Sequence, residues 1–185
     1  MKLRRGFRKE AEEYAAEYRA ELDLATDGPL CPFKLAALLE IPVVPLSHLD
    51  GFGPENPNYS PSRNGFYAAT IPIGTRRHII YNDMSHPNRQ RSDVMHEIAH
   101  TALGHPPHPP LTDDGCRNFN PVLELEAKEL SFTLLIPKPA ARRIVAQGIT
   151  SFQASIIYGA SKDLIEYRIR ITDAHGWDRN RQRYN

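Results

Sequence analysis

Two histidines and a glutamate in the segment HEIAH, residues 96–100, are the residues best suited to chemistry in this chain. Residues four positions apart lie on one face of an α-helix, so His96 and His100 can point their imidazoles at one ion. Zinc suits two neutral imidazoles and a carboxylate with a fourth position left open, and it lowers the pKa of water to about 7. Glu97 is close enough to accept a proton from such a water without binding the ion. The spacing therefore predicts a zinc site that hydrolyses amides, with Glu97 as the catalytic residue.

The residues around this motif favour a buried helix. The motif is flanked and interrupted by apolar residues, namely Met95, Ile98, Ala99, Ala102 and Leu103. A helix with this composition packs inside a protein, where polar side chains require compensation, and a metal ion provides it. HExxH sequences also occur on helices that bind no metal, so the prediction depends on a third ligand.

The third ligand separates the classes of zinc enzyme. A metzincin has the pattern HExxHxxGxxH, but here Gly104 falls one residue late and position 106 is proline. A peptide deformylase would use a cysteine in an EGCLS-type segment, and neither Cys31 nor Cys116 has that setting. A carboxylate from a second helix remains, as in the gluzincins.

The helix expected from Pro121 offers two carboxylates. Its apolar stripe consists of Leu123, Ala127, Leu130 and Leu134. At about 100° per residue, Glu126 lies about 40° from Leu130, at the edge of the inward face. Glu124 points away and has Lys128 four residues on, which is typical of a solvent-exposed ion pair. We therefore expect Glu126, rather than Glu124, to be the third metal ligand.

Three other side chains near the motif have simpler interpretations. His105 and His108 follow the helix in a proline-rich segment, where surface histidines are the more common case. Asp93 precedes the motif on the same helix and would either orient an imidazole from behind or interact with the helix dipole. None of the three is a predicted ligand.

Periodicity and the positions of proline and glycine predict the elements that hold this site. Residues 66–82 have the pattern of a hairpin, and IPVVPLSHL is at best an edge strand. Helices are expected over residues 7–22, 32–40, 87–103 and 121–135, followed by short helices that are broken by Gly148 and Gly159, the last running from Ser161 to His175. The expected fold is α+β: a small mixed or antiparallel sheet of about three strands, packed against the zinc-binding helix pair, with N-terminal and C-terminal helices.

Length and composition are those of one globular domain. The 185 residues divide into a catalytic core over about 7–137, a helical appendage over about 138–176 and a basic tail over 177–185. A formal charge of +1 gives no indication of nucleic acid or an anionic membrane as a partner. No apolar run approaches the ~18 residues that span a bilayer, and the basic N-terminus has no apolar signal core. We expect a cytoplasmic protein whose two cysteines are free thiols.

Two linked motifs resemble those of the ImmA/IrrE family of metallopeptidases. RQRSDVMHEIAHTALGH resembles the family signature RQRFxxAHELGHxLLH, and ELEAKELSFTLLIP resembles ExEANxFAxxLLMP, in the same order and spacing. The resemblance covers roughly residues 8–175. It implies that His96, His100 and Glu126 bind zinc and that Glu97 is the catalytic acid. Lys128 stands where the family has asparagine.

The resemblance also implies a substrate. Members of the family cleave helix-turn-helix repressors and so release genes for mobile-element excision or stress response. We expect a zinc endopeptidase that acts on an Xre-type repressor, held as an extended peptide at the edge of the 66–82 hairpin; manganese would also suit the ligands. The departure at Lys128 leaves a non-cleaving anti-repressor as the alternative. Direct DNA binding through residues 151–175 is not expected, because Leu164, Ile165 and Ile169 form a core-facing stripe.

Overall fold

The computed structural model describes residues 2–49, 66–106 and 120–183. The first part of the chain forms two helices and a short strand, and the middle part forms a hairpin and a long helix. The remaining elements are helical. In chain order they are α1 (Phe7–Glu21), α2 (Pro32–Leu38), β1 (Val43–Pro45), the 3-10 turn η1 (Leu46–His48), β2 (Ala68–Ile73), β3 (Arg76–Tyr81), α3 (Pro87–Ala102), α4 (Pro121–Leu135), α5 (Lys138–Ala146), α6 (Ser151–Tyr158), α7 (Lys162–Ile171) and α8 (Ala174–Arg183).

The three strands form one mixed sheet in the order β1-β3-β2. β2 and β3 are the predicted hairpin, paired antiparallel with Thr70 opposite Ile79. β1 lies parallel to β3 and places Val43 opposite Ile79. Its length of three residues fits a segment that contains prolines, which cannot donate a ladder hydrogen bond. The α+β fold with a small mixed sheet is therefore confirmed.

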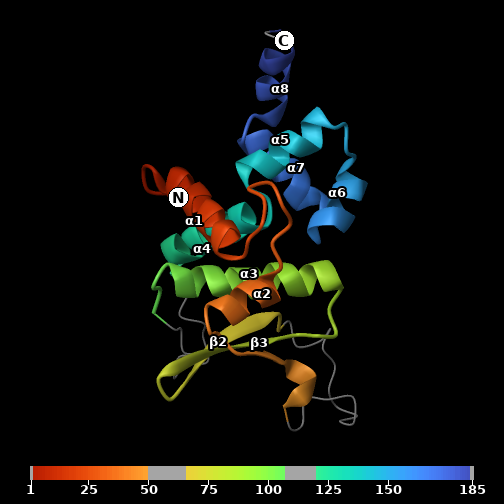
Figure 1. The fold of residues 1–185 in the computed structure, drawn as a ribbon. Helices are drawn as coiled ribbons and strands as arrows, with labels where there is room; N and C mark the ends of the chain where they lie inside the picture. The colour runs from red at the N-terminus through yellow and green to blue at the C-terminus, as the bar shows by residue number, and fades with distance from the viewer. Residues whose placement is uncertain (1, 50–65, 107–119, 184–185) are drawn as a thin grey trace.

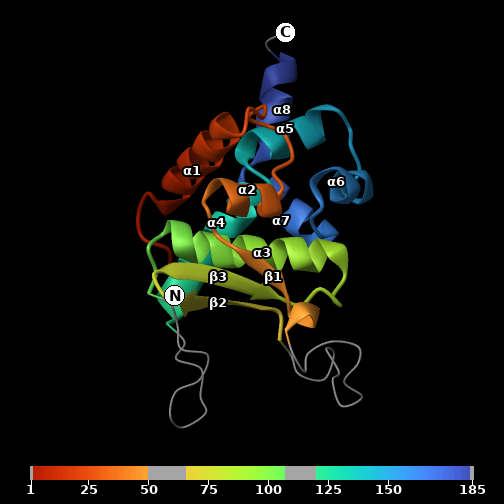
Figure 2. The same ribbon diagram turned by 60° about the horizontal axis from the view of Figure 1, so that its bottom comes forward.

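Helix α3 lies between the sheet and the other large helices (Figure 1). The view in Figure 2 shows the same order of layers, with the sheet on one side of α3 and α1, α4 and α7 on the other. Because neighbours cover both sides of α3, its apolar residues form the centre of the core; Val94, Met95, Ile98 and Ala99 are fully buried. The HEIAH segment is thus held on a helix that is packed on both sides.

Both helices that carry the predicted site have defined ends. Helix α4 begins at Pro121, as expected, and the Asn120 side chain accepts hydrogen bonds from the backbone N–H groups of Val122 and Leu123. Helix α3 begins at Pro87 and ends in a left-handed turn at Gly104, whose φ is 66°. A residue other than glycine would be strained in that turn.

The C-terminal helices differ from the prediction after Ile171. The stretch expected as a single helix from Ser161 to His175 is divided, because α7 ends at Ile171 and α8 begins at Ala174. Asp173 makes the break with a φ of 50°, in the left-handed region that aspartate tolerates better than most residues. Residues 177–183, predicted as a basic tail, lie in helix α8. Across the described ranges, every helix is too short or too polar to cross a membrane.

Candidate metal centre

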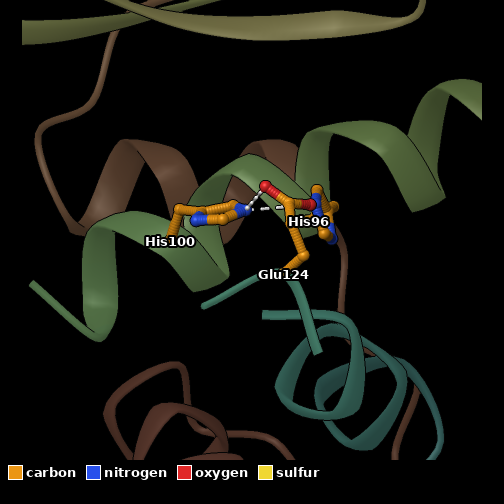
Figure 3. A group of neighbouring side chains, drawn as sticks. All are labelled: His96, His100 and Glu124. Atoms are coloured by element: carbon orange, nitrogen blue, oxygen red, sulfur yellow. Dashed lines mark hydrogen bonds and ion pairs between the residues drawn. The ribbon is translucent and has the colours of Figure 1, made fainter. Parts of the chain in front are cut away.

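Three side chains from two helices meet at one point (Figure 3). His96 and His100 come from α3, and the carboxylate of Glu124 reaches between them from α4. The Nε2 atoms of the two imidazoles lie 3.1 Å apart. The Glu124 oxygens lie 3.2 Å from Nε2 of His96 and 3.5 Å from Nε2 of His100. Three potential ligand atoms therefore surround a common centre.

These separations match the requirement of a tetrahedral zinc ion. Zinc–ligand bonds of about 2.0–2.1 Å at tetrahedral angles separate two ligand atoms by about 3.3 Å. The nitrogen–nitrogen and nitrogen–oxygen distances of 3.1, 3.2 and 3.5 Å fall on either side of that value. The donor set of two imidazoles and one carboxylate is one that zinc accepts, and three protein ligands leave a fourth position for water or substrate.

The electrostatics of the cluster keep the carboxylate ionised. Hydrogen bonding to His100, and then to His96, holds the pKa of Glu124 well below its usual range, although burial acts in the opposite direction. An ionised carboxylate is the form that binds a metal ion. Glu124 is therefore in the ligand form at neutral pH.

Glu97 directly follows His96 on α3, and its side chain is hydrogen-bonded to the sheet. The hydroxyl of Thr70 donates a hydrogen bond of 2.6 Å to Oε2 of Glu97. Thr70 is in the middle of β2, so one short bond connects the predicted catalytic residue to the edge of the sheet. The sequence analysis did not single out Thr70, because its position next to Glu97 depends on how the hairpin packs on α3.

Glu126 is the one predicted site residue that the structure does not bring to the histidine pair. Its Oε1 accepts a hydrogen bond of 3.0 Å from Nε of Arg4, and its Oε2 lies 3.7 Å from Nε2 of His105. The expectation that Glu126 rather than Glu124 faces His96 and His100 is therefore corrected.

The expected surface ion pair of Glu124 with Lys128 is corrected as well. Lys128 instead lies over the ring of Phe132, with 5.6 Å from Nζ to the ring centroid. The physical reason for both corrections is that the apolar stripe of α4 marks its buried face, whereas the cluster lies at the rim of the helix pair. There the side chains of His96 and Glu124 are 28% and 26% exposed. A site that receives a substrate must be open to solvent in this way. Closeness to the apolar stripe was therefore the wrong criterion for choosing the third ligand.

His105 is a functional candidate that the sequence analysis placed on the surface. It is only 5% exposed, and its Nδ1 lies 3.0 Å from Nδ1 of His100. Burial, and then the neighbouring His100, lower the pKa of His105. The signal that could have revealed it is Gly104, because a glycine directly after a helix folds the next residue back over the last turn. His108 lies outside the described residues.

Asp93 proves to be part of an ordinary helix pair. Its Oδ2 accepts a hydrogen bond of 3.1 Å from Nε of Arg89, four residues earlier on α3. Burial raises the pKa of Asp93, and Arg89 acts against that shift. The contact with Arg89 favours a structural role for Asp93.

Comparison with known protein families gives a match that includes the site. A profile of the IrrE N-terminal-like domain, which describes a peptidase family, matches residues 56–170, more than half of the 185 residues. The matched span contains α3 and α4 and therefore all three residues of the candidate metal site, His96, His100 and Glu124. No curated protein matches the chain.

Proposed function

Because the chain belongs to peptidase family M78, that of the IrrE N-terminal-like domain, and is a metallopeptidase, we propose that it is a zinc endopeptidase. We propose further that its substrate is a DNA-binding repressor. One observation carries the zinc assignment: the ligand atoms of His96, His100 and Glu124 all lie within 4.8 Å of one another. Glu124 takes the place that the motif comparison gave to Glu126.

The residues of the site divide the work between metal binding and proton transfer. His96, His100 and Glu124 would hold the ion, which when bound supplies a Lewis acid that polarises the scissile carbonyl and acidifies water. Glu97 accepts the proton of the attacking water and passes it to the leaving amine. The Thr70 hydroxyl fixes one oxygen of Glu97, so the other oxygen is left to accept the proton.

The edge of the sheet is the proposed position of the substrate. β2 pairs with β3 along one side, and among the described strands it has no partner along the other. A substrate segment that adds to this edge in extended form gains main-chain hydrogen bonds whatever its sequence, and its side chains provide selectivity. Because Thr70 joins β2 to Glu97, a peptide on this edge would pass beside the catalytic carboxylate.

The substrate class rests on the family motifs. Members with these two signatures cleave helix-turn-helix repressors, and the region that links a DNA-binding domain to its partner domain is a suitable extended segment. The proposed substrate is therefore an Xre-type repressor encoded next to this chain.

Cleavage of that repressor by purified protein tests the proposal. Zinc-loaded wild type should cut it at a defined bond, and Glu97→Gln should slow the reaction by about 100- to 10,000-fold, the usual contribution of a general acid–base residue. Glu166→Gln is the matched control, because Glu166 is an exposed glutamate on α7. Equal cleavage by Glu97→Gln overturns the assignment. An intact complex with both wild type and Glu97→Gln supports the non-cleaving anti-repressor instead.

A further inference from the structure

A row of polar side chains extends from His100 away from the candidate metal site. Nδ1 of His100 faces Nδ1 of His105 at 3.0 Å, and the two rings are inclined at 68° with centroids 5.0 Å apart. On the far side of His105, Nε2 lies 3.7 Å from Oε2 of Glu126. Glu126 is held by Arg4, whose Nε donates a hydrogen bond of 3.0 Å to Oε1. Helices α3 and α4, the turn after α3 and the N-terminal segment therefore contribute to one continuous chain of contacts.

The backbone at the end of α3 creates the central contact. The N–H of Gly104 bonds to the carbonyl of Thr101, and the N–H of His105 bonds to the carbonyl of His100, both at 3.0 Å. This is the Schellman arrangement, in which a left-handed residue turns the chain back along the helix. The turn places the ring of His105 against the outward side of the His100 ring, opposite the cluster.

The chemistry of imidazole then fixes where the protons lie. A neutral histidine carries one ring proton, and the nitrogen that binds a metal must be without it. If Nε2 of His100 binds zinc, its proton is on Nδ1 and points at His105. Nδ1 of His105 must then accept, which puts the proton of His105 on Nε2, facing the carboxylate of Glu126. Each residue in the row thus determines the tautomer of the next.

We propose that His105 and Glu126 are positioning residues that hold His100 in the tautomer and orientation required to bind zinc. The inference rests on the proposed zinc site and adds to it two residues that do not touch the ion. Ligand histidines in zinc proteins are generally held by a hydrogen bond to their second ring nitrogen. Here a second histidine backed by a carboxylate serves as that partner.

Burial supports a role beyond filling space. His105 is 5% exposed and Glu126 is 9% exposed, and polar groups removed from water destabilise a protein unless they are paired. The contact of Glu126 with Arg4 also explains why its carboxylate is turned from the metal cluster, since Arg4 and His105 lie on its other side.

Zinc affinity, measured by competition with a chromogenic chelator, tests the inference without any assay of activity. His105→Leu should weaken zinc binding by about 10- to 100-fold, the usual effect of losing an outer partner of a ligand. His105→Asn should recover most of that loss, because its side-chain oxygen can accept at the position of Nδ1. Glu126→Gln should show a smaller loss, and the exposed His175→Leu none.

The outcomes separate this inference from the proposed function. Absence of zinc binding by wild type would overturn both. Equal affinity of wild type and His105→Leu would overturn the positioning role alone and leave the zinc site intact.

A second measurement uses wild type and so does not depend on the folding of a variant. Ring-nitrogen NMR of zinc-loaded protein with isotope-labelled histidine reports which nitrogen carries each proton. The expected pattern has the proton of His100 on Nδ1 and that of His105 on Nε2. A proton on Nδ1 of His105 would overturn the inference, because the two facing nitrogens would then both be donors.

Discussion

Glu124 and Glu126 are separated by one residue and differ in what they contact. The Glu124 carboxylate lies between two imidazoles at 3.2 and 3.5 Å, and the Glu126 carboxylate lies between Arg4 and His105. Loss of an outer partner of a ligand typically lowers zinc affinity about 10- to 100-fold. Glu124→Ala should lower zinc affinity by more than this, whereas the loss of affinity in Glu126→Ala should stay within that range. The same chelator competition measures both. A larger loss in Glu126→Ala would reverse the assignment of the third ligand.

Thr70 provides a separate prediction about catalysis. Its hydroxyl bonds to Oε2 of Glu97 at 2.6 Å, and a hydrogen bond to a charged group contributes roughly 1.5–3 kcal/mol. Thr70→Val keeps the shape of the side chain and removes the bond, so kcat should fall about 10- to 100-fold while KM and zinc affinity stay near their wild-type values. Thr70→Ser should restore most of kcat. Loss of zinc affinity in Thr70→Val would show that Thr70 supports the fold instead.

The sequence could identify some of these residues and not others, for a physical reason. His96, Glu97 and His100 follow from the geometry of a single helix, which spacing alone determines. Glu124, Thr70 and His105 depend on how three other segments cross or fold back on that helix. A periodicity argument ranks residues by burial, and it favoured Glu126 because Glu126 is close to the apolar stripe of α4. The candidate metal site, however, lies at the rim of α4 rather than under that stripe.

At the scale of elements, the cap of α4 should matter to the metal centre. The Asn120 side chain accepts from the N–H of Val122 at 3.0 Å and from that of Leu123 at 3.5 Å, and Glu124 lies in the same first turn. Asn120→Ala should reduce the free energy of unfolding by about 1 kcal/mol, and it should also weaken zinc binding because the first turn frays.

Thr150 offers a matched control for that prediction. It caps α6 with a complete capping box, and Figure 1 shows α6 across the molecule from α4. Thr150→Ala should lose a similar free energy of unfolding, measured by urea denaturation, while its zinc affinity remains that of wild type. Equal losses of zinc affinity in both variants would mean that general stability, and not the cap of α4, governs the site.

Element boundaries were predictable where one residue type controls them. Pro87 and Pro121 begin their helices, and Gly104 and Gly159 follow the ends of theirs in the left-handed conformation. The break at Asp173 was not predictable, because aspartate enters the left-handed region only where packing favours it. The α5–α8 contact that accompanies the break involves residues far apart in sequence.

At the scale of the whole molecule, a buried ionic network joins the C-terminal helices to the core. Arg168 of α7 is 2% exposed; its guanidinium lies 2.6 Å from Glu12 of α1 and 3.3 Å from Glu129 of α4. It also donates a hydrogen bond of 2.8 Å to the carbonyl of Ile136. An arginine buried in this way is part of the core, in agreement with the core-facing stripe of α7.

Removal of Arg168 should accordingly destabilise the entire fold. Arg168→Ala removes the buried cation beside the carboxylate of Glu129, which among the described residues keeps the Tyr167 hydroxyl and the exposed Arg8 as partners. Breaking a buried pair in this way typically reduces the free energy of unfolding by about 3–5 kcal/mol. Arg170→Ala is the matched control: Arg170 is exposed on the same helix, so its loss should change stability by about 0.5 kcal/mol or less. Urea denaturation followed by circular dichroism measures both. If the two variants lost equal stability, the network would not be what joins α7 to α1 and α4, and apolar packing by Leu164 and Ile165 would have to account for that contact.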